Sequence, residues 1–404
     1  MRKVLAVGVL FFLFTGIAFA YEPGDVVKSR CSEKQEARAD CSSFIPHPAK
    51  NVIVFVGDGM GLNAIYSGRV FKNGPSEPLS FETFSHRSLI KTCSLSGVTD
   101  SAAAATALAC GGKTYNGQIG TAADGRAMED ASELARKSGK SVGLVTTDSV
   151  VGATPSAFSL HEGSRFTFDN LVTDYLAFKP DALLGGGRQW FEKKSGDKSS
   201  IDKFKDLGYM VALNLSELEK AGKAPLLGLF ADMEMNFVLD RKSESPEPEL
   251  SQMVQKAIDL LSRDPEGFFL LVEAARIDHA SHAGNFEKML REVSGLDDAV
   301  KAARDFQTRN PDTLILVTSD HETGGLVVKT GDYKKGDVVK GRYTTGIPGV
   351  HFNHSAQKVG LFGEGPGAEN VEKAGDNTQV FCVISRAITN RSEQTEEKGC
   401  ECGK

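Results

Sequence analysis

The sequence predicts an α/β fold: a three-layer α/β/α sandwich with a large, mostly parallel central sheet flanked by helices. First, the apolar runs are continuous rather than alternating, which is typical of parallel strands buried on both faces. Second, segments with helical spacing separate these runs, as a parallel sheet requires. Third, acidic residues and histidines follow several runs, and the carboxyl ends of parallel strands collect at one edge of a sheet. The pattern therefore predicts an architecture and a place for a functional site.

The first twenty residues predict a targeting segment rather than part of this fold. Arg2 and Lys3 precede an apolar run, residues 4–14, and small residues at 18–20 form a cleavage signal. This pattern is typical of a secretory signal peptide, here cut after Ala20, and it is too short to span a membrane. We therefore expect a periplasmic or secreted protein with no membrane span.

The elements after this segment can be justified in chain order. Residues 21–48 are polar and predict an arm, and residues 51–61 predict an apolar strand that ends in an acidic, glycine-rich turn. Alanine and leucine favour helices, so a helix is predicted from Ser101 to Cys110. The later elements are an amphipathic helix at 125–138, a tight loop at 152–156, strands at 141–147, 181–187, 267–273 and 313–321, and helices at 250–263 and 287–309.

These elements predict one catalytic domain over residues 49–386. Residues 329–350, rich in glycine and lysine, predict a surface insertion within it. Residues 387–404 predict a polar tail that contains cysteine.

The charge balance excludes one class of partner and favours another. The 404 residues carry a formal charge of −6, and loss of the two basic residues in 1–20 makes it −8. An acidic chain lacks the basic surface that binds nucleic acid. It also repels anionic substrates unless cations lie in the site, which favours bound metal ions.

The seven cysteines predict disulfides and one free thiol, because an exported protein can form disulfides and an odd number leaves one unpaired. Cys110 lies on the apolar helix and is the expected free, buried thiol. Cys31 with Cys41 is the easiest local pair, and Cys400 with Cys402 could close the tail. The spacing alone does not fix the pairing.

Acidic residues and histidines recur at the ends of the apolar runs. Asp58, Glu273 and the pair Asp320-His321 each end such a run. Asp278 and His282 are four residues apart and share a face if that turn is helical. Imidazole and carboxylate groups are ligands for Zn²⁺, and oxygen-only groups suit Mg²⁺. Each residue alone has a structural explanation, but together they predict a metal site.

The segments that carry these residues resemble the alkaline phosphatase family. They run in the family's order from about Asn51 to Val383 and cover most of the mature chain. The matching segments are 56–61, 98–103 with 112–117, 153–155 with Arg165, 273–282, 318–325, and His354 with 365–368.

The resemblance implies an enzyme that hydrolyses phosphate monoesters through a phosphoserine intermediate and releases inorganic phosphate. Ser101, which opens the predicted alanine-rich helix, resembles the nucleophile. Arg165 resembles the guanidinium that binds two phosphate oxygens, a geometry that lysine cannot supply. Asp100 is expected to orient Arg165. Family members are usually homodimers, so a homodimer is expected.

The resemblance also implies two zinc ions and one magnesium ion per subunit. One zinc site would activate the water that hydrolyses the phosphoserine, and the other would lower the pKa of Ser101. The implied ligands are Asp278, His282 and His354 for the first zinc, Asp58, Asp320 and His321 for the second, and Asp58, Thr154 and Glu273 for magnesium.

Two positions depart from the family pattern. Some bacterial members have an acidic residue just before the Ala-Thr-Pro segment, where this chain has Gly152. Weaker magnesium binding, or a different metal in the third site, is expected from that change. His279 follows the expected ligand Asp278, where some members have lysine or tryptophan. It is predicted to tune phosphate and water at the rim of the site without binding zinc.

The other histidines are expected to be structural. His351 lies three residues before His354, but the family match favours His354 as the ligand and gives His351 a supporting role. His161 is interpreted as a packed or hydrogen-bonded loop residue. His47 and His86 have no motif around them.

The sequence disfavours three other functions. A phosphodiesterase or phosphotransferase on a related metal scaffold commonly lacks the serine, arginine and magnesium set that occurs together here. A sulfatase is disfavoured because no Cys/Ser-x-Pro-x-Arg segment occurs. An exported phosphate- or metal-binding protein without activity should have lost the nucleophile or a ligand, and none of the principal residues is missing.

Overall fold

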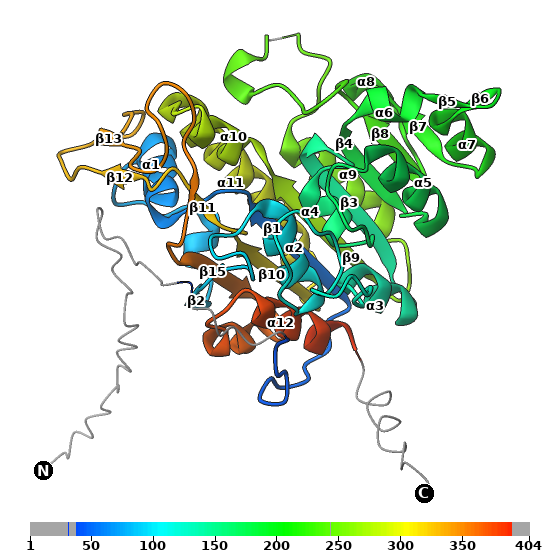
Figure 1. The fold of residues 1–404 in the computed structure, drawn as a ribbon, viewed down its shortest axis with the longest axis horizontal. Coiled ribbons are helices and arrows are strands. Elements are labelled where there is room, and N and C mark those ends of the chain that lie inside the picture. The colour runs from blue at the N-terminus through cyan, green and yellow to red at the C-terminus, as the bar shows by residue number, and fades with distance from the viewer. Residues whose placement is uncertain (1–30, 32–37, 243, 390–404) are drawn as a thin grey trace, which may run out of the picture.

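A nine-stranded sheet lies at the centre of the protein, between two layers of helices (Figure 1). We describe it from a computed structural model that covers residue 31 and residues 38–242 and 244–389. The spatial order of the strands is β2-β15-β10-β1-β9-β3-β4-β8-β7. Their bounds are Asn51–Gly57 (β1), His86–Ile90 (β2), Ser141–Ser149 (β3), Ala182–Gly186 (β4), Met210–Ala212 (β7), Leu226–Leu229 (β8), Phe268–Ala274 (β9), Thr313–Thr318 (β10) and Val359–Glu364 (β15).

Seven neighbouring strands of the sheet, from β10 to β7, pair in parallel. At one end, β15 pairs antiparallel with β10, and β2 pairs antiparallel with β15. The predicted α/β fold with a mostly parallel sheet is therefore confirmed. The two antiparallel strands, like β7 and β8 at the other end of the sheet, lie outside the apolar runs from which strands were predicted.

Alternating side chains of β1 divide the core in two. Val52, Val54 and Val56 pack on one face of the sheet with α2, α3, α4, α5, α6, α7 and α12. Ile53 and Phe55 pack on the other face with α1, α8, α9, α10 and α11. The helices span Leu62–Lys72 (α1), Ser101–Cys110 (α2), Ala131–Lys137 (α3), Ala153–Ala157 (α4), Phe168–Phe178 (α5), Arg188–Glu192 (α6), Ser200–Asp206 (α7), Leu215–Lys220 (α8), Leu250–Leu261 (α9), Arg276–His282 (α10), Phe286–Arg309 (α11) and Thr378–Ile388 (α12).

Two local predictions were wrong. The helix expected over 125–138 begins only at Ala131, because the Asp130 carboxylate accepts hydrogen bonds from the backbone N–H groups of Ser132 (2.8 Å) and Glu133 (2.9 Å) and so caps α3. The loop expected at 152–156 is instead the short helix α4, which begins after Gly152. Helix α2 has the predicted bounds, although Asp100 rather than Ser101 is its N-cap.

Short two-stranded ribbons and 3₁₀ helices complete the described chain. The ribbon of β11 (Glu322–Thr323) and β14 (His354–Ser355) pairs Thr323 with His354 and lies at the site described below. The expected insertion at 329–350 follows β12 (Val327–Val328) and contains β13 (Gly341–Arg342), which pairs with it. The other short elements are β5 (Lys194–Ser195), β6 (Lys198–Ser199), η1 (Ser80–Thr83), η2 (Val238–Asp240) and η3 (Ala368–Lys373).

Disulfides connect the N-terminal arm to distant parts of the fold. Cys31 bonds to Cys93 and Cys41 bonds to Cys382, so the expected Cys31–Cys41 pair was wrong. The arm runs beside the end of α12, where the N–H of Ala49 donates to the carbonyl of residue 387 (2.8 Å), and this places Cys41 against Cys382 rather than Cys31. Cys110 is free and buried in the described part of the chain, as predicted.

Some expectations fall on residues that the structure does not describe. The signal peptide and its cleavage after Ala20 lie outside the described residues, as do Cys400 and Cys402.

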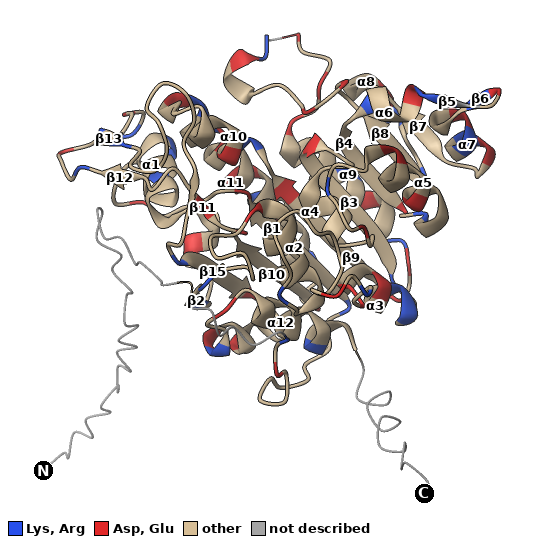
Figure 2. Cartoon of the chain, in the orientation of Figure 1, with Lys and Arg blue, Asp and Glu red and all other residues tan. Residues whose placement is uncertain are grey.

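Within the described residues, no helix is both long enough and apolar enough to cross a membrane. Lysine and arginine are interspersed with aspartate and glutamate along the outer helices and loops (Figure 2).

Candidate functional site

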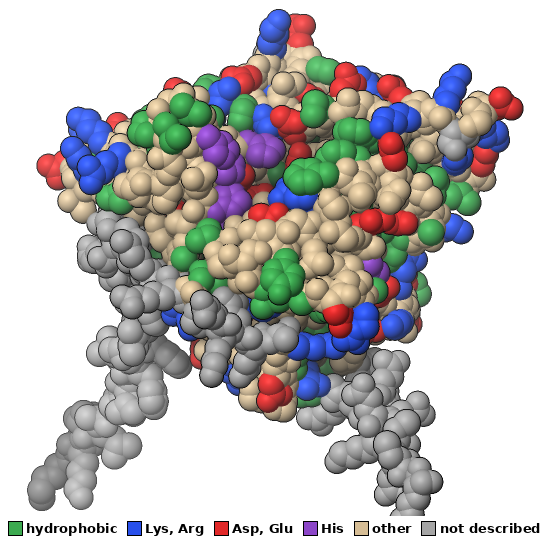
Figure 3. Space-filling view, in the orientation of Figure 1, with side chains coloured by type: hydrophobic (Ala, Val, Ile, Leu, Met, Phe, Trp, Pro, Cys, Tyr) green, Lys and Arg blue, Asp and Glu red, His purple; other side chains and the backbone are tan. Residues whose placement is uncertain are grey.

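The predicted site residues converge at one edge of the central sheet. Four neighbouring strands run in parallel, in the order β10, β1, β9 and β3, so their carboxyl ends lie together. Asp58 follows β1, Glu273 lies near the end of β9, and the pair Asp320-His321 follows β10. In the space-filling view, histidines gather at a hollow of this face beside basic and hydrophobic side chains (Figure 3).

Ser101 is the first residue of α2, and its hydroxyl faces this edge. It is only 5% exposed, and its Oγ lies 3.1 Å from Nε2 of His321. One oxygen of the neighbouring Asp100 caps the helix by accepting from the Ala103 N–H (3.0 Å). The positive end of the helix dipole at this point favours an anion.

The second carboxylate oxygen of Asp100 holds Arg165. This oxygen lies 3.2 Å from Arg165 Nη1 and also accepts from the N–H of Gly117 (3.0 Å). The Arg165 backbone N–H donates to the Gly117 carbonyl (2.7 Å), which fixes the loop beside the start of α2. Asp100 therefore contacts Arg165 in the way that the predicted orienting role requires.

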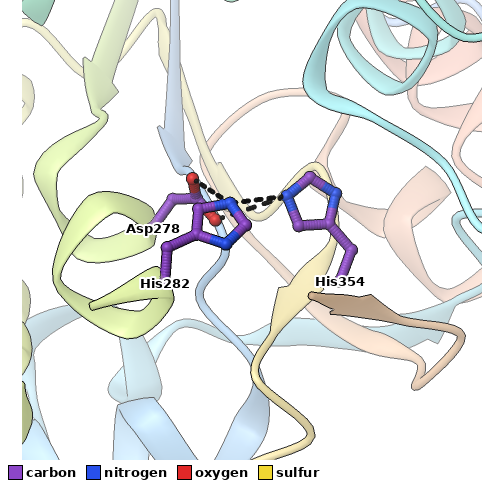
Figure 4. A group of neighbouring side chains, drawn as sticks. All are labelled: Asp278, His282 and His354. Atoms are coloured by element: carbon purple, nitrogen blue, oxygen red, sulfur yellow. Dashed lines mark hydrogen bonds and ion pairs between the residues drawn. The ribbon is translucent and has the colours of Figure 1, made fainter. Parts of the chain in front are cut away.

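Asp278, His282 and His354 form the first of the two predicted zinc groups (Figure 4). Asp278 and His282 lie one turn apart on α10, and the β14 ribbon brings His354 from the opposite side. Nε2 of His282 lies 3.1 Å from one Asp278 oxygen, and Nε2 of His354 lies 3.6 Å from the other. The two Nε2 atoms are 3.0 Å apart.

The hydrogen bonds behind these imidazoles fit a metal ion. Nδ1 of His354 contacts the Thr99 carbonyl (2.8 Å), and Nδ1 of His282 contacts the Phe352 carbonyl. A carbonyl accepts only, so each Nδ1 carries a proton, and Nε2 is the nitrogen of each ring that can bind a metal. The two Nε2 atoms lie 3.0 Å apart and both approach Asp278, so three donors suited to one metal ion converge.

The electrostatics of this group also favour the anionic form of its carboxylate. Burial by itself raises the pKa of Asp278, but the hydrogen bond from His282 and the nearby imidazoles hold that pKa below its usual range. Burial, together with His321, lowers the pKa of His354 to about 4, so this ring is neutral at ordinary pH. A carboxylate and a neutral imidazole are the protonation states that bind a metal.

Asp58, Asp320 and His321 form the second group, and all three are buried. Nε2 of His321 lies 3.1 Å from Asp320 Oδ2 and 3.4 Å from Asp58 Oδ1. Neither of these oxygens has a hydrogen-bond partner, although both are buried. Burial raises the pKa of Asp58, and the charges of Asp320, Asp278 and Glu273 raise it further. Orphaned oxygens among crowded carboxylates fit a bound cation.

Thr323 connects the two groups, a role that sequence reasoning missed. Its hydroxyl donates to Asp278 Oδ1 and lies 3.2 Å from Nδ1 of His321, from which it can accept. Nε2 of His321, the other ring nitrogen, faces Asp320 and Ser101. In the sequence, the feature that could have indicated this role is a threonine two residues after the expected ligand His321.

Gly59 allows the two groups to approach. Its N–H donates to Asp320 Oδ1 (3.1 Å) at a φ of +70°. A Cβ there would lie 2.7 Å from Thr323 Oγ1 and 2.8 Å from Asp278 Oδ1. A larger residue would therefore push into both groups.

The resemblance assigns a third ion to Glu273 and Thr154 together with Asp58. Thr154 is completely buried, and Glu273 is only 2% exposed. Thr146 donates to the Glu273 carboxylate. Burial, followed by the charge of Asp148, raises the pKa of Glu273 to about 8. The Thr154 hydroxyl makes no well-directed hydrogen bond in its 0% exposed position, so it remains available to an ion.

The remaining histidines make other contacts. His279 Nδ1 accepts a hydrogen bond from Arg276 Nη1 at 2.5 Å, so His279 lies beside Arg276. Its predicted effect on phosphate stays a prediction. The ring of His351 stacks on His282 with centroids 4.2 Å apart, in a supporting position. His161 is hydrogen-bonded, as predicted, to the carbonyl of residue 120 (2.8 Å) and to Glu133 (3.2 Å). His47 and His86 pair with surface carboxylates.

Comparison with known proteins gave one consistent result. A family model described as alkaline phosphatase matches residues 49–345. Alkaline phosphatase 3 of Bacillus subtilis is 35% identical over 340 residues, which cover 81% of this chain and 70% of that protein. Alkaline phosphatase H of Pseudomonas aeruginosa is 31% identical over 429 residues, which cover 90% of each chain.

Solved structures give the same result for the fold. The alkaline phosphatase of the Antarctic bacterium TAB5 superposes with a TM-score of 0.75 at 31% identity, and the match covers 85% of this chain and 99% of that one. Two variants of the TAB5 enzyme, with TM-scores of 0.74, carry magnesium in a site called M3.

Proposed function

The chain belongs to the alkaline phosphatase family and is a phosphatase, and from that premise we propose that it hydrolyses phosphate monoesters through a phosphoserine on Ser101. The observation that carries the proposal is the position of Ser101. Its Oγ lies at a helix start, 3.1 Å from Nε2 of a histidine in one metal-binding group. The guanidinium of Arg165 is held nearby by Asp100, which also caps that helix.

We propose that the two histidine–carboxylate groups hold zinc and that the Asp58, Thr154 and Glu273 group holds magnesium. The facing Nε2 atoms of His282 and His354 and the orphaned buried oxygens support this assignment. Bound metal ions would supply Lewis-acid polarisation of the phosphate and lower the pKa of Ser101 and of a water molecule. Nitrogen and carboxylate donors suit zinc, whereas an oxygen-only set suits magnesium.

Different residues of the chain would then bind the phosphate group and carry out the displacement at phosphorus. The planar guanidinium of Arg165 would donate hydrogen bonds to two phosphate oxygens, and Asp100 would fix its orientation. Ser101 Oγ would attack phosphorus while the P–O bond to the alcohol breaks, so the alcohol leaves and a phosphoserine forms. Attack by water on the phosphoserine would return Ser101 and release inorganic phosphate. The N–H groups at the start of α2 would favour the anionic phosphate throughout.

We also propose the remaining sequence-based assignments. The apolar leader supports export with cleavage after Ala20, to the periplasm or the medium, and N-terminal sequencing of the mature protein tests it. The single family match across most of the chain supports one catalytic domain over residues 49–386. A homodimer rests on the family resemblance, and sedimentation equilibrium tests it.

The central experiment measures hydrolysis of p-nitrophenyl phosphate at alkaline pH before and after chelation. Zinc and magnesium are restored separately, and the Ser101→Ala variant is assayed beside the wild type. We expect activity to disappear on chelation, to return chiefly with zinc, and to fall by about 10³-fold or more in the serine variant, because the covalent route is lost. Zinc content measured on both proteins controls for loss of the site.

Two results would contradict the proposal. A folded, zinc-loaded protein that is inert on monoesters would redirect the search to diesters and then to a binding function. A Ser101→Ala variant with wild-type activity and zinc content would exclude the phosphoserine route.

A further inference from the structure

A carboxylate outside the expected ligand sets lies beside the third metal-binding group. Asp148 is near the end of β3 and is half-buried. Its backbone N–H donates to Thr146 Oγ1 (2.9 Å), and that hydroxyl in turn donates to the Glu273 carboxylate. One threonine therefore ties the backbone of Asp148 to Glu273.

The side chain of Asp148 fills the space beside Gly152. A Cβ on Gly152 would lie 2.7 Å from Asp148 Oδ2 and 2.8 Å from the Ser149 carbonyl oxygen. Gly152 is the N-cap of α4, two residues before Thr154. The Asp148 carboxylate therefore occupies the space into which a side chain at residue 152 would extend, and such a side chain would displace that carboxylate and press on the Ser149 backbone.

Asp148 and Glu273 are neighbouring carboxylates at this point. Glu273 is buried and is connected to Asp148 through Thr146. No ion pair to Asp148 occurs in the part of the chain that the structure describes. The Thr154 hydroxyl, which is completely buried, has no well-directed hydrogen bond. This buried hydroxyl lies beside Glu273 and also points to a ligand.

We propose that Asp148 is part of the magnesium site, where its carboxylate holds water molecules of an ion bound by Asp58, Thr154 and Glu273 and takes the place of a side chain at residue 152. The inference rests on the proposed function for the identity of that site. Magnesium retains several of its water molecules and binds few carboxylates directly. A half-buried carboxylate at the border of a buried site can accept hydrogen bonds from such water molecules. The weaker magnesium binding expected from Gly152 is then offset by Asp148.

The experiment measures magnesium binding rather than turnover. Zinc-saturated wild type and the Asp148→Asn variant are dialysed against graded magnesium, and both metals are counted per chain by mass spectrometry. Asn keeps the shape of the side chain and removes its charge. We expect the magnesium Kd to rise roughly tenfold or more, as for other outer-sphere groups, with zinc unchanged. Asp174→Asn, a half-buried carboxylate on α5, is the matched control and should leave the magnesium Kd unchanged.

A second variant keeps the test decisive if Asp148→Asn is poorly folded. Asp148→Glu retains the charge and should keep most of the magnesium affinity, and the midpoint of thermal unfolding with and without magnesium gives an independent reading of it. A wild-type Kd in Asp148→Asn would overturn the inference. So would a wild type that binds zinc but no magnesium, although zinc-dependent hydrolysis would still uphold the proposed function. Magnesium loss in Asp148→Asn, on a chain inert toward monoesters, would support the site and contradict the proposed function.

Discussion

Replacing Thr323 by valine should weaken both predicted zinc sites at once. The Thr323 hydroxyl donates to Asp278 in one group and lies 3.2 Å from Nδ1 of His321 in the other. Valine has nearly the same shape, so the change removes these two contacts without opening a large cavity. It leaves the buried Nδ1–H of His321 without an acceptor and removes one hydrogen bond from the Asp278 carboxylate.

The magnitude follows from those two contacts. A hydrogen bond to a charged group contributes about 1.5–3 kcal/mol, and an unsatisfied buried donor costs about 1–3 kcal/mol. Partners of metal ligands change metal affinity by roughly 10–100-fold when they are removed. We therefore expect Thr323→Val to raise the zinc Kd at both sites by about that factor and to lower kcat, because His321 also faces Ser101.

The assay is competition for zinc against a chromogenic chelator, with kcat measured at saturating zinc. Thr106→Val is the matched control, because Thr106 is also fully buried but bonds to the loop at residues 118–120. That variant should lose stability and keep its zinc affinity. Two-site zinc binding of wild-type strength in Thr323→Val would refute the proposed coupling between the sites.

Three further predictions concern separate features. Arg165→Lys should lower kcat/KM for phosphate monoesters by about 10–100-fold, since lysine cannot form the two-pronged contact, and unchanged kinetics would contradict its role. Gly59→Ala should destabilise the protein by about 2–4 kcal/mol in denaturant unfolding, because its φ of +70° and the 2.8 Å approach to Asp278 Oδ1 both disfavour a side chain. Burial disfavours the charged form of His161, but the hydrogen bonds to Glu133 and to the Gly120 carbonyl, together with the charges of Asp130 and Glu133, outweigh it and raise the pKa to about 9. Its contribution, roughly 2 kcal/mol, should be complete below pH 6.5 and lost as pH rises through 9, and the pH profile of unfolding should flatten in His161→Gln.

Much of the fold was predictable because its signals are local. Continuous apolar runs identified β1, β3, β4, β9 and β10, and alanine content identified α2 with its bounds. The prediction missed β2, β7, β8 and β15, of which β7 and β8 span only three and four residues and β2 and β15 form the antiparallel end of the sheet. The start of α3 was misjudged because a single side-chain cap at Asp130 outweighs the helical spacing before it. The cysteine pairing was misjudged because residues 341 apart in sequence meet where the arm crosses α12.

The sequence by itself determined the residue types of the site and their placement at strand ends, because hydrophobic periodicity and short motifs are read along the chain. Only the tertiary structure decided which groups face one another. It brings His354 to α10 through a two-stranded ribbon and sets Thr323 between two metal-binding groups. It also places Asp148 in the space beside Gly152. These contacts depend on how distant segments pack, and packing is settled by the shape and burial of the whole fold rather than by local propensity.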